Sequence, residues 1–278
     1  MVKIYCDTTS DLNQELIDRF QPTIIPLYVS LGDQSYRGTD ITTSDLFEFV
    51  EKTGTLPKTS APTVGDFTQT FSIPDDILYI SLSSALSATF QNAILSLDLI
   101  DKKNIRLIDS KSLSTGIGLL VCAAAEYRDQ GCTLDEIEEK IRAMIPNLRV
   151  SFVIETLDYL YKGGRCSALQ NILSSLLSIR PVIEVRADGS LGVKAKTRGS
   201  RKKALTYLLD EFKKDLPAID LHRIFITHTG CDEDAQFLKQ SVLELCSPEE
   251  IHITNAGSII ASHCGPDTIG LLYVLKSQ

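Results

Sequence analysis

The chain has 278 residues, of which 43% are hydrophobic and 23% charged, and its formal net charge is −8. These values are typical of a folded protein of about two domains, and they argue against non-specific nucleic-acid binding, which relies on clustered Lys and Arg. No apolar run reaches the length of a membrane span, and the N-terminus lacks the apolar core of a signal peptide. Seven scattered cysteines without a CxxC pair are typical of a reducing compartment, so we expect a cytoplasmic protein with no integral membrane association.

Residues 1–149 are predicted to form an N-terminal α/β domain, because extended and helical patterns alternate along them. Extended segments are expected at 2–6, 23–31, 77–81 and 105–109. Helices are expected at 11–20, 42–52, 85–100 and 113–129, with two more opening near Thr63 and Thr133. Two prolines at 57 and 62 predict a loop between them, since proline cannot donate to a strand ladder. The alternation favours right-handed βαβ units and a parallel sheet.

Residues 150–278 are predicted to form a C-terminal α+β domain with a largely antiparallel sheet. Strands are expected at 149–155, 181–186, 191–197, 223–228, 251–254 and 270–275. Helices are expected at 157–161, 168–178, 200–213 and 232–246. The turn residues of Ala187–Ser190 between two of these strands indicate a β-hairpin.

Three clusters of hydroxyl side chains follow predicted strands of the first half, at Asp7–Ser10, Ser81–Thr89 and Asp109–Thr115. In an open α/β sheet, ligands bind outside the carboxyl ends of the strands, where hydroxyls and helix N-termini suit an anionic or polar head group. Helix capping is the alternative for each cluster, but capping needs one hydroxyl and the second cluster has several. The sequence therefore predicts binding at the second cluster, which contains Ser87.

Other candidates carry weaker signals. Thr59 and Ser60 lie in the loop between prolines, and His263 lies among small residues that would allow close approach of a ligand. Arg165 and Arg198 belong to two basic stretches on this acidic chain. An ordinary turn, a structural histidine and solvated surface are the respective alternatives. No nucleophile elbow, P-loop or paired zinc-ligand motif is present, so no cofactor or metal is expected.

Together these motifs resemble those of the DegV family of bacterial lipid-binding proteins, in order and spacing from residue 2 to about 275. The matching stretches are Cys6–Leu12, Lys58–Ser60, Ser83–Gln91, Asp109–Ser112, Lys162–Arg165 and Ser262–Pro266. The resemblance implies two domains that enclose one long-chain fatty acid, such as palmitate, in a buried tunnel. It also implies that the protein has no catalysis of its own and presents the fatty acid to a separate fatty acid kinase, which makes an acyl phosphate.

By the same resemblance, Thr59, Ser60, Ser87 and His263 would hold or adjoin the carboxylate, and Arg165 and Arg198 would lie near the head group or on the face toward the kinase. The chain departs from the family pattern at several positions. Ala61 stands where Gln is frequent, Ala88 where Gly is frequent, and Asp267 adds a negative charge close to the expected head-group site.

Two other classes of function stay open at this point. A hydrolase of acyl esters would use Ser87 as its nucleophile and His263 as its base. A protein-interaction module would bind no small molecule at all.

Overall fold

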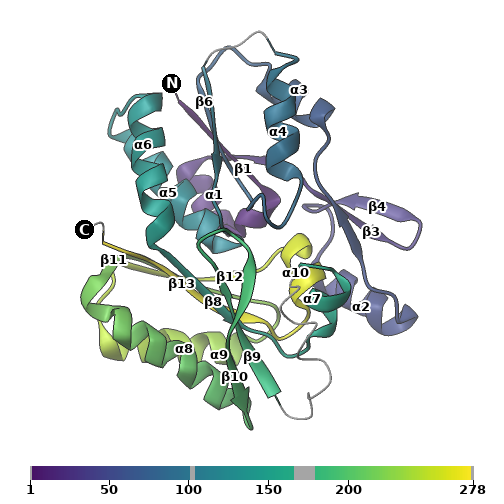
Figure 1. Ribbon diagram of the computed structural model, residues 1–278, viewed down its shortest axis with the longest axis vertical. Helices are drawn as coiled ribbons and strands as arrows, with labels where there is room; N and C mark the ends of the chain where they lie inside the picture. The colour runs from purple at the N-terminus through teal and green to yellow at the C-terminus, as the bar shows by residue number, and fades with distance from the viewer. Residues whose placement is uncertain (1, 101–103, 166–178, 277–278) are drawn as a thin grey trace.

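The computed structural model describes residues 2–100, 104–165 and 179–276 (Figure 1). Its first half is built on a four-stranded sheet in the order β2-β1-β6-β7, and the three strand pairings are parallel. The strands are β1 (Lys3–Asp7), β2 (Thr23–Ile25), β6 (Ile77–Ser81) and β7 (Ile105–Asp109). The predicted parallel sheet is thereby confirmed.

Helices cover both faces of this sheet. Successive side chains of a strand point to opposite faces, and both faces here carry apolar side chains that are buried under helices. Tyr5 and Tyr79 face α3 (Val64–Phe71) and α4 (Thr89–Leu97), whose apolar side chains pack against them. Ile4 and Ile80 belong to the opposite core. That core is covered by α1 (Gln14–Phe20), α5 (Thr115–Asp129) and α6 (Leu134–Met144).

The second half is built on a six-stranded sheet in the order β10-β9-β8-β13-β11-β12, in which only β11 and β12 run parallel. The strands are β8 (Leu148–Val153), β9 (Ile179–Val185), β10 (Leu191–Arg198), β11 (Ile219–His228), β12 (Glu250–Asn255) and β13 (Ile269–Leu275). Two helices, α8 (Arg201–Asp215) and α9 (Asp232–Leu245), pack on one face, and α5 packs on the other. The predicted largely antiparallel sheet and the hairpin at 187–190 are confirmed.

A small third sheet corrects the prediction of a loop between the two prolines. It has the order β4-β3-β5 and consists of β3 (Tyr28–Leu31), β4 (Gln34–Arg37) and β5 (Lys58–Ser60). Pro57 and Pro62 flank β5 without occupying it, so every residue of the strand can pair. The adjacent helix α2 (Thr43–Thr53) is preceded by Thr42, which caps it in a capping box with Asp45.

Several predicted bounds shift for local reasons. The extended run 23–31 divides into β2 and β3 around Pro26. The first helix begins at Gln14 because the Asn13 side chain caps it, and the helix predicted from 85 begins only at Thr89. Helix α7 (Asp158–Lys162) agrees with the prediction within one residue, α10 (Ser258–Cys264) was not predicted, and the predicted helix 168–178 lies outside the described residues.

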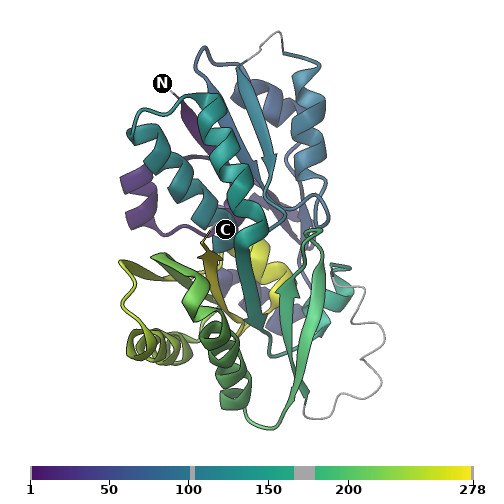
Figure 2. The ribbon, with the colours of Figure 1, turned by 60° about the vertical axis from the view of Figure 1, so that its left-hand side comes forward.

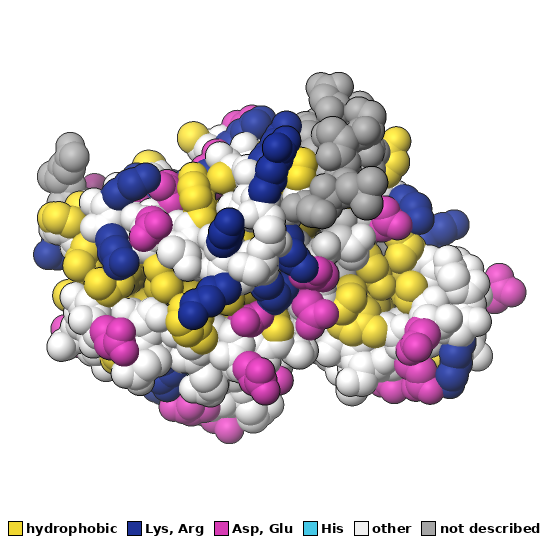
Figure 3. Space-filling view, turned by 90° about the horizontal axis from the view of Figure 1, so that it is seen from below, with side chains coloured by type: hydrophobic (Ala, Val, Ile, Leu, Met, Phe, Trp, Pro, Cys, Tyr) yellow, Lys and Arg dark blue, Asp and Glu magenta, His cyan; other side chains and the backbone are white. Residues whose placement is uncertain are grey.

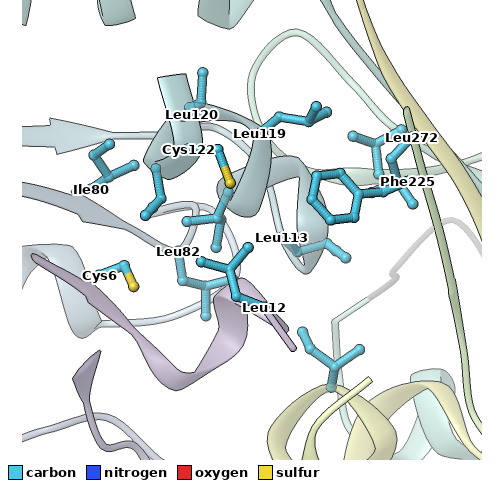
Figure 4. Close-up of a cluster of buried hydrophobic side chains, with 14 of the residues drawn as sticks. Cys6, Leu12, Ile80, Leu82, Leu113, Leu119, Leu120, Cys122, Phe225 and Leu272 are labelled. Atoms are coloured by element: carbon cyan, nitrogen blue, oxygen red, sulfur yellow. The ribbon is translucent and has the colours of Figure 1, made fainter. Parts of the chain in front are cut away.

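One hydrophobic core joins the two halves of the chain. Figure 4 shows Leu82 and Leu113 of the first half beside Phe225 and Leu272 of the second, all members of a single buried cluster. Packed apolar side chains therefore form part of the contact between the halves. Within the described residues, no helix is long and apolar enough to cross a membrane.

Candidate functional site

The three hydroxyl-rich clusters meet at one edge of the parallel sheet, and their polar groups bind one another. The buried Asp7 carboxylate accepts a hydrogen bond from the Leu82 backbone N–H at 2.9 Å. Ser83 N–H donates to the Ser112 carbonyl at 2.9 Å, and Ser84 N–H donates to Asp109 Oδ1 at 3.1 Å. Because these groups satisfy one another, the first and third clusters act as a scaffold for the second.

A cavity lies beside this edge, where β5, α7, α10 and the β9–β10 hairpin converge. Its walls are largely aliphatic, with polar groups supplied by a few side chains. The aliphatic residues are Leu27, Leu82, Leu86, Leu113, Leu160, Leu191, Ile259 and Ile260, and the predicted site residues among the lining are Thr59, Ser60, Ser87, Arg165 and His263.

Thr59 and His263 form a direct contact across the cavity wall, although they lie far apart in the sequence. Thr59 Oγ1 is 2.7 Å from His263 Nε2, and His263 Nδ1 has no hydrogen-bond partner among the described residues. Gly163 makes room for the ring, since a Cβ at this position would lie 2.7 Å from Nδ1. Burial, reinforced by the Arg165 charge, lowers the pKa of His263 to about 4, so the imidazole is neutral at pH 7.

Ser87 and Arg165 complete the polar end of the cavity. Ser87 Oγ lies 2.8 Å from Thr89 Oγ1 and accepts from the Thr89 backbone N–H at 3.3 Å, in the turn that leads into α4. Arg165 follows α7, and its guanidinium donates to the carbonyl of Gly163 at 2.5 Å and, at 3.4 Å, to that of Leu86. Arg165 thus ties the end of α7 to the Ser87 loop and brings one positive charge to the cavity.

Arg198 and Asp267 do not belong to the described lining of this cavity. Arg198 lines a separate depression on β10 and α8, together with Lys203 and Tyr207. Figure 3 shows Lys and Arg side chains gathered on this lower face of the molecule, among scattered acidic groups. Asp267 is exposed, is absent from the described cavity lining, and exerts its charge on Cys231.

The aliphatic walls were not predicted from the sequence. Ile259 and Ile260 lie on α10, whose short length and flanking glycines gave no helical signal. A second cavity continues toward Phe152 and Leu272, and it shares Leu113, Ile260 and Cys264 with the first. Within the ranges 2–100, 104–165 and 179–276, no cluster of His, Cys, Asp and Glu could hold a metal ion.

The sequence and the fold of this chain were compared with those of known proteins. The family model described as "Uncharacterised protein, DegV family" matches residues 1–276. A DegV domain-containing protein of Caldanaerobacter subterraneus subsp. tengcongensis is 31% identical over 285 residues, which cover 99% of each chain.

Solved structures agree over the whole length. A DegV family protein of Thermus thermophilus, described by its fatty acid binding, has a TM-score of 0.91 and 30% identity, with 99% of each chain covered. A stearic-acid-binding protein of Eubacterium ventriosum has a TM-score of 0.89 and 27% identity, over 100% of this chain and 99% of that one. The Fatty Acid Kinase (Fak) B3 protein of Streptococcus pneumoniae, loaded with linoleic acid, has a TM-score of 0.87 and 25% identity, over 99% of this chain and 100% of that one. By its sequence and its fold, this chain belongs to the DegV family.

Proposed function

We propose that this protein binds one long-chain fatty acid between an N-terminal domain of residues 1–149 and a C-terminal domain of residues 150–278. The observation that carries the proposal is an aliphatic cavity whose polar groups converge: Thr59, Ser87 and His263, with Arg165 beside them. A fatty acid has the matching division into a charged head and an apolar tail. The fatty acids bound by the structural relatives support the same ligand class.

The head group would be oriented by hydroxyls rather than by a buried ion pair. Thr59 and Ser87 can each donate to a carboxylate, with Ser60 at the exposed side and His263 holding Thr59 in place. A hydrogen bond to a charged acceptor contributes about 1.5–3 kcal/mol. Two such bonds fix the orientation of the head but are too weak to account for tight binding alone.

The tail supplies the remaining free energy. Each buried methylene contributes about 0.8 kcal/mol, so a tail of about fourteen methylenes offers roughly 11 kcal/mol before the costs of association. We propose that the tail passes Leu113, Ile260 and Cys264 into the second cavity, because these residues form the wall that the two cavities share. Affinity would then follow tail length.

The alternative of an acyl hydrolase receives no support from the contacts of its two essential residues. Ser87 Oγ bonds within its own turn to Thr89, whereas His263 Nε2 bonds to Thr59. A histidine with a pKa of about 4 is also a weak general base at neutral pH. We therefore propose a binding protein without catalysis of its own.

A protein that encloses its ligand needs a partner that uses it. The Streptococcus pneumoniae relative carries the name of a fatty acid kinase component. We propose that this chain likewise presents its fatty acid to a separate kinase. Arg165 at the cavity and Arg198 on the lower face are the candidates for contact with that partner.

Native mass spectrometry of the purified protein, followed by denaturation and lipid identification, tests the binding proposal. We expect an added mass that corresponds to one fatty acid per chain. A protein that is purified empty and does not take up added fatty acids would refute the proposal.

A further inference from the structure

Strands β8 and β9 are paired over only part of their length. Their register covers Ser151–Val153 of β8 and Val182–Glu184 of β9, and it does not extend to Leu148–Val150. Beyond this point β9 stays paired with β10, up to Val185 opposite Leu191. The hairpin therefore leans away from β8 toward its tip, and Figure 2 shows this separation between the teal strand and the green pair.

A groove of about 560 Å³ lies in this separation, and we call it the β8–β9 groove. One wall is the part of β8 that pairs with β13 but not with β9, and the other is the end of β9 with the start of its turn. Residues of the 3₁₀ turn Ile145–Asn147 and of the Lys111 loop also line it. The groove is distinct from the lipid cavity, since the two share no lining residue. The hairpin separates them, with Leu191 on the cavity side and Arg186 on the groove side.

Cations outnumber acidic residues in the described lining of the groove, on a protein whose net charge is −8. Lys111, Arg149, Arg186 and Lys194 line it, and Glu184 is the only acidic residue of its described lining. Three of the four cations have carboxylate neighbours of their own, namely Lys111 with Asp109, Lys194 with Glu184 and Glu211, and Arg149 with Asp215 at 3.8 Å.

Arg186 forms no salt bridge with a described residue, although its charge acts on Asp188 of the same hairpin turn. Its guanidinium lies over Gly192 of β10, where a Cβ would be 2.2 Å from Nε. The glycine thus lets the guanidinium lie close against β10. An arginine held in this way is suited to a carboxylate, which it can bind through two parallel hydrogen bonds.

We propose that the β8–β9 groove binds an extended, acidic segment of a partner protein, which adds as a strand along the β9-facing edge of Leu148–Val150. Strand addition to an open sheet edge combines main-chain hydrogen bonds with pockets for alternate side chains. Here the apolar positions would face Ile145, Leu148 and Val185, and the acidic positions would face Arg149 and Arg186. The length and mixed lining of the groove favour a polypeptide over a small anion, which needs cations that converge on one point.

A fluorescein-labelled ten-residue peptide of alternating glutamate and valine is the probe, titrated by anisotropy into the intact, lipid-loaded protein. We expect saturable binding that weakens with salt. Arg186→Glu should weaken it by about tenfold or more, because it replaces a charge-assisted hydrogen bond with a repulsion. Lys3→Glu is the matched control, since it makes the same change of charge at an exposed position on β1, outside the groove.

The outcomes are decisive in both directions. If Arg186→Glu weakens peptide binding and Lys3→Glu does not, the result supports binding in the groove. If replacing the central valine of the peptide with proline abolishes binding, the result supports strand addition. Equal loss in both protein variants, or no binding of the peptide at low salt, overturns the proposal. Binding of anionic phosphatidylglycerol vesicles or of inorganic phosphate that depends on Arg186, without peptide binding, overturns it in favour of a lipid or phosphate site. The lipid content of each variant, measured by mass spectrometry, keeps this test independent of the proposed fatty acid binding.

Discussion

Replacing Thr59 with valine tests the head-group site most directly. The change keeps the shape of the side chain and removes the hydroxyl that lies 2.7 Å from His263 Nε2. If Thr59 donates to the carboxylate as proposed, the change deletes one hydrogen bond to a charged acceptor, which contributes about 1.5–3 kcal/mol. We therefore expect the fatty acid to bind about ten to one hundred and fifty times more weakly.

The assay is a titration of delipidated protein with saturated fatty acids of increasing length. In the wild type, each added methylene should strengthen binding about fourfold, which corresponds to about 0.8 kcal/mol. Thr59→Val acts at the head, so it should weaken every member of the series by the same factor and leave the dependence on length unchanged. Thr55→Val is the matched control, because it makes the same chemical change at an exposed residue four positions earlier.

Three results would contradict this reasoning. Thr59→Val could bind as well as Thr55→Val, its effect could grow with tail length, or the methyl ester could bind the wild type as tightly as the acid. The first would remove Thr59 from the head-group site. The second would place Thr59 along the tail, and the third would show that no residue of the site recognises the carboxylate.

Three further predictions concern neighbouring residues. Ser87→Ala should weaken fatty acid binding by about tenfold while the urea midpoint of unfolding stays unchanged; unaltered affinity would exclude Ser87 from the head-group site. Ile260→Trp should obstruct the wall that the two cavities share, so binding of long tails should fall sharply and binding of short ones little; an equal loss at all lengths would contradict a tail that passes this wall. Burial lowers the pKa of His263 from 6.5 to about 4. The contribution of His263 to the unfolding free energy of the delipidated protein is therefore fully present above pH 6.5. It is lost as the pH falls toward 4, by about 3 kcal/mol in all. The difference in unfolding free energy between wild type and His263→Gln should narrow over that pH range; a constant difference would mean that the imidazole does not titrate as its burial requires.

Local sequence patterns were sufficient to predict the two sheets. The strands of the parallel sheet alternate with amphipathic helices, and the turn residues Ala187–Ser190 join two apolar runs, so each signal lies within a few residues of the element that it predicts. The predicted direction of pairing followed from the same pattern, since alternating strands and helices favour a parallel sheet.

The site depended on contacts that no local pattern records. Strand β5 exists because β3, about thirty residues earlier, pairs with it, and its flanking prolines suggested the opposite. Helix α10 has only seven residues and lies between Gly257 and Gly265, so its sequence shows little helical periodicity. Thr59 lies on the first of these elements and His263 on the second, and their contact appears only once the chain has folded.

The resemblance leaves two positions open for Arg198, near the head group or on the face toward the kinase. A basic stretch in the sequence identifies charge but not the face on which the charge lies. Strand β10 carries Leu191, at its start, into the cavity and Arg198, at its far end, onto the lower face. Any role of Arg198 is therefore one of surface contact, and its substitution should leave the affinity for the free fatty acid unchanged.

The position of the cavity also predicts how ligand and fold depend on each other. Its walls come from both halves of the chain, with Leu82 and Leu113 from one and Leu191 and Ile260 from the other. The Ser83 hydroxyl, which donates to the Gly189 carbonyl at 2.9 Å, fastens the hairpin to the first half beside the same cavity. A fatty acid that fills the cavity therefore binds the joined halves and not the separated ones, so by mass action it stabilises the whole chain against unfolding. At a free concentration one hundred times the dissociation constant, this stabilisation is about 2.7 kcal/mol, which is a large share of the net stability of a typical domain.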